Sequence, residues 1–80
     1  MPALQRKVLD YLEAHPDEVF ASRDDEVLAK AIGHPNADAV GWASWALQKA
    51  GLLPRQKVRG RFYYGGKAAI ANLRRRLEKR

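Results

Sequence analysis

Apolar positions near the start of the chain recur three and four residues apart. This spacing places them on one face of a helix, which we expect over residues 2–14 and which the dipeptide His15-Pro16 ends. The stretch that follows, DEVFAS at residues 17–22, is interpreted as a short connector. We expect its Val19 and Phe20 to fill the core.

Two further helices are predicted, each with a capping residue in front of it. The second helix is expected over residues 23–32, with Ser22 as its cap, acidic residues in its first turn and Gly33 as its left-handed C-terminal cap. The third is expected over residues 37–50, with Asn36 as its cap. Two helices joined by the breaker sequence GHPN are typical of a helix-turn-helix unit.

The third helix contains both tryptophans of the chain in the stretch GWASWALQKAG. Its spacing predicts a buried stripe formed by Val40, Ala43, Leu47 and Ala50. Trp45 then points roughly opposite the centre of this stripe. Trp42 lies nearer its flank, so we expect Trp42 to pack within the chain.

The stretch LLPRQKVRGRFYY predicts a β-hairpin over residues 52–64. We expect a three-residue tip formed by Arg59, Gly60 and Arg61, because a two-residue tip would mix polar and aromatic side chains on each face. In the expected register Val58 lies opposite Phe62 and Gln56 lies opposite Tyr64. Arg55, Lys57 and Tyr63 share the other face.

A fourth helix is expected over residues 67–79, with Ile70, Leu73 and Leu77 at coiled-coil spacing. These three side chains have two interpretations. They either pair with a second copy of the chain or cover the core of their own domain.

Composition and charge restrict the function more than the fold. A chain of 80 residues has room for one hydrophobic core, so we expect a single domain. Residues 1–40 carry four basic and eight acidic side chains, whereas residues 41–80 carry eleven basic and one acidic. Such segregation favours a polyanion as partner, and nucleic acid before membrane, because no basic helix presents an apolar membrane-facing side.

The order of these elements resembles a known family. EVLAKAIG, then a capped helix that ends in ALQKAGLL, then RQKVRGRFYY are similar to the second helix, recognition helix and wing of winged-helix DNA-binding domains. The resemblance implies an α+β, mostly helical fold, with the third helix in the major groove of double-stranded DNA and the wing along the backbone or minor groove. It also implies a small transcriptional regulator.

Basic side chains in the hairpin carry the DNA-binding prediction. Four basic residues lie within seven positions of the chain: Arg55, Lys57, Arg59 and Arg61. No acidic residue within the hairpin can pair with them. We expect them to contact phosphates, although surface strands also use basic residues to protect their edges. The predicted DNA-binding residues are Asn36, Trp42, Trp45, Lys49, Arg55, Lys57, Arg59 and Arg61.

Three residues of this region have more than one interpretation. Trp45 either contacts nucleic acid, anchors a protein interface or packs within the chain. Asp38 either stabilises the start of its helix or accepts a hydrogen bond from a cytosine amino group. Asn36 is first a cap, although a helix N-terminus also binds phosphate. A winged-helix protein-interaction module anchored by the tryptophans is therefore the alternative function.

The sequence contains no pattern that indicates catalysis. His15 and His34 each precede a proline at a helix boundary, there is no cysteine, and no histidine pair has zinc-ligand spacing. We expect no enzyme, no catalytic residue, no metal and no cofactor. No signal sequence or long apolar run is evident, so we expect a cytoplasmic protein, associated with the nucleoid if the source is bacterial or archaeal. A homodimer through Ile70, Leu73 and Leu77, or through Trp45, is the other partner considered.

Overall fold

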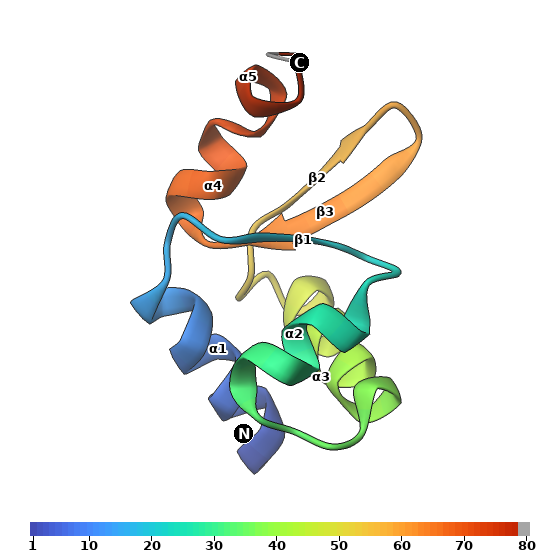
Figure 1. Cartoon of the computed structure of the whole chain (residues 1–80). Helices are drawn as coiled ribbons and strands as arrows, with labels where there is room; N and C mark the ends of the chain where they lie inside the picture. The colour runs from blue at the N-terminus through green and yellow to red at the C-terminus, as the bar shows by residue number, and fades with distance from the viewer. Residues whose placement is uncertain (79–80) are drawn as a thin grey trace.

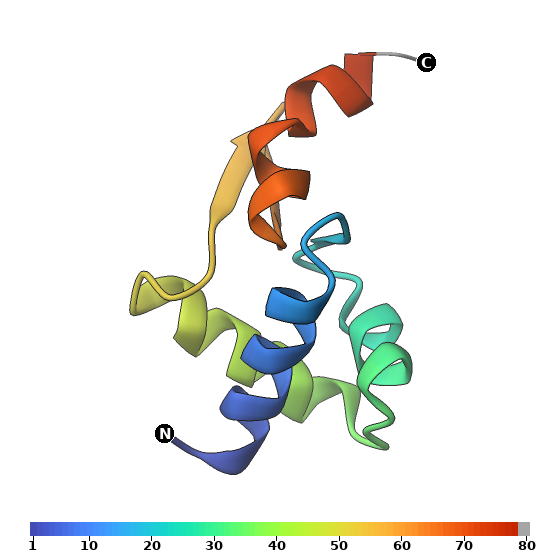
Figure 2. The ribbon, with the colours of Figure 1, turned by 90° about the vertical axis from the view of Figure 1, so that its left-hand side faces the viewer.

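Helices gather at both ends of the molecule, and one small sheet lies between them (Figures 1 and 2). The computed structural model describes residues 1–78. Its elements, in chain order, are α1 (Ala3–Ala14), β1 (Val19–Ala21), α2 (Asp25–Ile32), α3 (Ala37–Lys49), β2 (Arg55–Val58), β3 (Arg61–Gly65), α4 (Lys67–Ala71) and α5 (Leu73–Glu78). The described chain is thus mostly helical α+β, with one antiparallel sheet of strand order β1-β3-β2.

The core lies where α1, α2 and α3 meet the underside of the sheet. Its fully buried side chains come from all of these elements: Val8, Leu12, Leu28, Val40, Leu47 and Tyr64. Phe20 of β1 packs in the same cluster, with its ring centroid 6.0 Å from that of Tyr64. The expectation that Phe20 fills the core is confirmed.

The predicted connector is instead a strand, and this correction changes the start of α2. Val19 to Ala21 pair with β3 in the register Val19↔Gly65 and Ala21↔Tyr63. Ser22 continues this edge, because its backbone N–H and its hydroxyl both donate to the carbonyl of Phe62, at 3.0 and 3.1 Å. Ser22 therefore does not cap α2, which begins at Asp25 rather than at residue 23. The predicted end of this helix is confirmed, since Gly33 is left-handed with φ of 72°.

The buried stripe of α3 is displaced from the predicted one. Val40, Ala43 and Leu47 are buried as expected, but Ala50 is exposed and follows the last helical residue. Ser44 and Gln48 are buried in its place. The centre of the buried stripe thus shifts toward Ser44. The buried Ser44 hydroxyl has a hydrogen-bond partner, because it donates to the Gly41 carbonyl at 2.9 Å. The predicted cap is confirmed, because the Ala39 N–H donates to Asn36 Oδ1 at 3.1 Å.

The hairpin exists, but its register differs from the prediction. Val58 pairs with Arg61, so the tip has only two residues, Arg59 and Gly60. Their φ angles of 52° and 79° are both left-handed, the conformation of the two-residue turn whose twist matches that of a hairpin. Arg55 and Lys57 consequently lie opposite Tyr64 and Phe62 rather than sharing a face with Tyr63. In Figure 1 this hairpin extends beyond β1 and its tip projects from the molecule.

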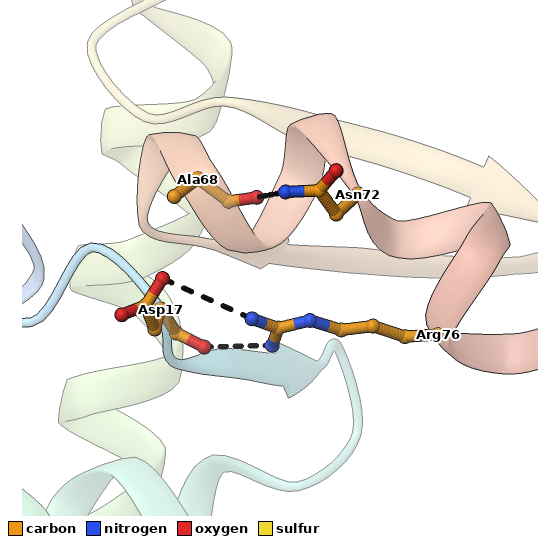
Figure 3. Close-up of polar contacts among 4 residues, drawn as sticks. All are labelled: Asp17, Ala68, Asn72 and Arg76. Atoms are coloured by element: carbon orange, nitrogen blue, oxygen red, sulfur yellow. Dashed lines mark hydrogen bonds and ion pairs between the residues drawn. The ribbon is translucent and has the colours of Figure 1, made fainter.

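The predicted fourth helix is broken in two at Asn72, and its last predicted residue, 79, lies outside the described residues. The Asn72 side chain donates to the Ala68 carbonyl at 3.0 Å, so it competes with the backbone for that acceptor (Figure 3). Beyond the break, Arg76 donates to the Asp17 carbonyl at 2.7 Å and lies 3.9 Å from the Asp17 carboxylate. Arg76 thus ties α5 to the segment before β1.

Two of the three apolar residues considered for dimer contact are buried in their own chain. Ile70 is 8% and Leu73 1% exposed, whereas Leu77 is half-buried. The α4 segment packs beside β3, as Figures 1 and 2 both show. Ile70 and Leu73 are thus buried within their own chain.

Candidate nucleic-acid interface

One face of α3 carries a row of exposed side chains, Asp38, Trp42, Trp45 and Lys49, which we call the α3 stripe. Their spacing of four, three and four places them on the side opposite the buried stripe. Trp42 is 70% and Trp45 45% exposed. The expectation that Trp42 packs within the chain is therefore wrong. The buried stripe is centred nearer Ser44 than predicted, and this shift turns Trp42 away from the core.

The two indoles form an ordered pair. Their ring centroids are 5.9 Å apart and their planes are nearly perpendicular, at 87°. This edge-to-face arrangement is favoured because the positive edge of one ring meets the negative face of the other. The Lys49 ammonium lies 4.6 Å from the centroid of the Trp45 ring, within the range of a cation–π contact. The α3 stripe thus combines two aromatic surfaces with a cation at its C-terminal end.

An open cavity of about 480 Å³ lies beside the indoles. It is lined by Ser22, Asp25, Asp38, Gly41, Trp42 and Trp45, and we call it the indole–carboxylate cavity. Gly41 leaves room for the Asp25 side chain, because a Cβ at this position would meet the Asp25 carboxylate. Burial, then the Asp38 carboxylate and then the Asp24 carboxylate raise the pKa of Asp25 above its usual value. The cavity therefore presents acceptors beside aromatic surfaces.

The second surface is the side of the hairpin on which Arg55, Lys57 and Phe62 lie, which we call the hairpin face. Phe62 is 40% exposed. The Arg55 guanidinium and the Lys57 ammonium lie 5.1 and 5.5 Å from the centroid of its ring. These contacts explain why a register that mixes basic and aromatic side chains is tolerated, since each cation is attracted to the ring that it covers.

The two other predicted basic residues of the hairpin differ in their surroundings. Arg59 is exposed in the turn at the tip. Arg61 lies 3.8 Å from the Asp24 carboxylate, just before α2. Sequence reasoning recognised that no acid within the hairpin pairs with these residues, but it missed Asp24, which the fold brings in from a distant segment. Arg61 is therefore less available to a ligand than Arg55, Lys57 and Arg59.

The α3 stripe and the hairpin face belong to one continuous surface. Ser22 lines the indole–carboxylate cavity and also a second open cavity with Arg23, Gly60, Arg61 and Phe62. Of the predicted site residues, Trp42 and Trp45 line the first of these cavities and Arg61 lines the second. Asn36 instead uses its side-chain oxygen to cap α3. Phe62, Ser22 and Asp25 belong to this surface and were not predicted. Only Phe62 has a signal in the sequence, because it directly follows the basic tip Arg59-Gly60-Arg61.

Comparisons of this chain with protein-family models, with curated proteins and with solved structures find no match. Across residues 1–78, no helix is both long and apolar enough to cross a membrane. Over the same residues, no cluster of three or more histidine, cysteine or acidic side chains is arranged to hold a metal ion. The functional argument therefore rests on the surface formed by α3 and the hairpin.

Proposed function

We propose that this chain is a winged-helix domain that binds double-stranded DNA, with α3 in the major groove and the β2–β3 hairpin along the backbone or minor groove. A small transcriptional regulator is the role that we infer. The chain order of helix, strand, two helices and hairpin supports this layout. The observation that carries the proposal is the hairpin face, where Arg55 and Lys57 lie exposed around Phe62 on a projecting hairpin (Figure 1).

The charges support phosphate contact by this surface. The basic excess of the chain lies in residues 41–80, whereas the acidic residues are concentrated in residues 1–40. Arg55, Lys57 and Arg59 are exposed, and each adds one positive charge to the hairpin. Cations on a projecting ribbon bind duplex DNA by releasing counterions from the phosphates, and such binding weakens as salt rises.

Replacement of Arg55, Lys57 and Arg59 by Gln tests the proposal. The matched control replaces Lys67, Arg74 and Arg75, which are exposed on α4 and α5, and it lowers the net charge by the same three units. In fluorescence anisotropy with a labelled duplex, the hairpin variant should lose about tenfold or more in affinity, whereas the control should lose much less. Equal losses in the two variants would reject a role for the hairpin.

A second candidate function is protein binding through the tryptophans. The observation that favours it is the 70% exposure of Trp42 beside Trp45, because exposed tryptophan is enriched in protein interfaces. On this hypothesis Trp45→Ala abolishes self-association or partner binding and leaves nonspecific DNA affinity nearly unchanged. Light scattering on both forms tests self-association. A monomeric mass for both, together with a loss of DNA affinity in the variant, would reject this second function.

A further inference from the structure

The indole–carboxylate cavity has a chemistry that phosphate binding does not use. Trp42 and Trp45 offer aromatic surfaces, and Trp42 is the most exposed large apolar side chain among residues 1–78. Asp25 and Asp38 offer oxygens that only accept hydrogen bonds when ionised. A ligand that fits both must combine a flat aromatic surface with hydrogen-bond donors.

The carboxylates of this cavity also lack cationic partners within the described part of the chain. The ion pairs formed there by acidic residues involve Asp10, Asp17 and Asp24. Both carboxylates line the same cavity, and the pKa of Asp25 is raised first by burial and then by repulsion from Asp38. Donor groups supplied by a ligand would relieve this repulsion.

The neighbouring surface indicates where such a ligand would come from. Ser22 connects the cavity to the hairpin face, where Arg55 and Lys57 lie exposed around Phe62. A nucleic-acid backbone held on these cations would run beside the cavity. Bases within a duplex keep their faces stacked, so only a base that has left the stack can enter between an indole and a carboxylate.

We propose that the indole–carboxylate cavity receives one unpaired nucleobase that carries an exocyclic amino group. The base stacks on Trp42, and its amino group donates to Asp25 or Asp38. Cytosine, adenine and guanine carry such a donor, whereas thymine does not. This inference rests on the proposed function, because the hairpin must hold the nucleic acid to which the base belongs.

Three short duplexes of otherwise identical sequence test the inference: one fully paired, one with a single unpaired cytosine and one with a single unpaired thymine. The cytosine duplex should bind about tenfold more tightly than the paired duplex, in line with the usual strength of base–aromatic stacking. It should also bind more tightly than the thymine duplex. Both tryptophans of the chain line the cavity, so entry of the base should quench the intrinsic fluorescence.

Variants at exposed positions separate stacking from hydrogen bonding. Trp42→Ala should remove the advantage of an unpaired base, and Trp42→Phe should retain most of it. Asp38→Asn should reduce the preference for cytosine over thymine while stacking persists. Far-ultraviolet circular dichroism of each variant checks that the fold is unchanged, as the exposure of both side chains leads us to expect.

Three results would overturn the inference. Equal affinity for all three duplexes, with affinity still lost in the hairpin variant, would reject the cavity as a base site and leave the proposed function intact. Absence of salt-dependent binding to any duplex would reject both. Quenching by a lysine-rich peptide but by none of the duplexes would assign the cavity to a basic protein segment instead.

Discussion

The Tyr64 hydroxyl is the least satisfied polar group in the core, and Tyr64→Phe should stabilise the chain. The side chain is fully buried, and its hydroxyl has no hydrogen-bond partner among residues 1–78. Burial outweighs the influence of Ser44, which lowers the pKa of Tyr64 but whose hydroxyl donates to the Gly41 carbonyl rather than to Tyr64. Burial dominates and raises that pKa to about 12.

The expected gain in stability follows from the missing hydrogen bond of the Tyr64 hydroxyl. A buried polar group without a partner costs about 1–3 kcal/mol of folding free energy. Removal of one oxygen recovers this cost and leaves only a small void, so we expect Tyr64→Phe to raise the free energy of unfolding by about 1 kcal/mol. For a chain of this size, that corresponds to an increase of about 4–8 °C in Tm.

Urea denaturation followed by circular dichroism measures this change. An unchanged slope of the free energy of unfolding against urea concentration would show that the variant exposes as much surface on unfolding as the original chain. Ser44→Ala, alone and combined with Tyr64→Phe, is the control, because the two changes should be additive if no hydrogen bond joins the hydroxyls. A loss of about 1 kcal/mol or more in Tyr64→Phe, with coupling to Ser44, would refute this reasoning.

The same residue predicts a response to alkali. The pKa of Tyr64 is higher in the folded state than in the unfolded state, so folding favours the neutral phenol. The stabilisation is complete below about pH 10 and is lost as the pH rises toward about 12. Unfolding at high pH should therefore be less steep in Tyr64→Phe than in the original chain.

Three further predictions concern the cavity and α5. Gly41→Ala should raise the free energy of unfolding by about 0.5–1 kcal/mol, because alanine favours a helix interior more than glycine does. The new Cβ would displace only the Asp25 carboxylate. A lower free energy of unfolding in urea denaturation would contradict this prediction. Asp25→Asn should become more stable relative to the original chain as the pH rises from about 3 to about 7. The reason is that the pKa of Asp25 is raised in the folded state, so folding disfavours the ionised carboxylate. A constant difference in the free energy of unfolding between the two chains across this range would refute that cause. Arg76→Ala should lower the free energy of unfolding by about 1 kcal/mol, because it removes the hydrogen bond to the Asp17 carbonyl. Arg75→Ala, at an exposed neighbouring position, is the control and should have little effect. Equal changes in Tm for the two variants would contradict the contact in Figure 3.

Local patterns predict the helices well and the sheet poorly. The outward position of Trp45 follows from helical spacing, whereas that of Trp42 was predicted wrongly. Asn36 begins α3 and Gly33 ends α2, as their residue types predict. The strand β1 could not be predicted, because it has three residues and its partner β3 lies some forty residues further along the chain. The break at Asn72 is local, and there the Ala68 carbonyl accepts from both the side chain and the backbone N–H of Asn72.

The site shows the same division. The basic residues of the hairpin and the exposed position of Trp45 can be predicted, because alternation and periodicity are local properties. The exposure of Phe62 could not be predicted, since it depends on a two-residue turn with Arg59 in a left-handed conformation. The pairing of Arg61 with Asp24 and the place of Asp25 beneath Gly41 depend on how α2 packs against the sheet and α3.

The affinity of the chain for duplex DNA as a function of salt tests the central proposal most directly. Arg55, Lys57 and Arg59 are the hairpin cations least engaged within the chain. Three phosphate contacts predict a slope of about −2.7 in a plot of the logarithm of the association constant against that of the salt concentration, and steeper if Lys49 contributes. Affinity should then fall about 40-fold between about 50 and 200 mM salt. A slope near zero, or no measurable binding at the lower concentration, would contradict the account.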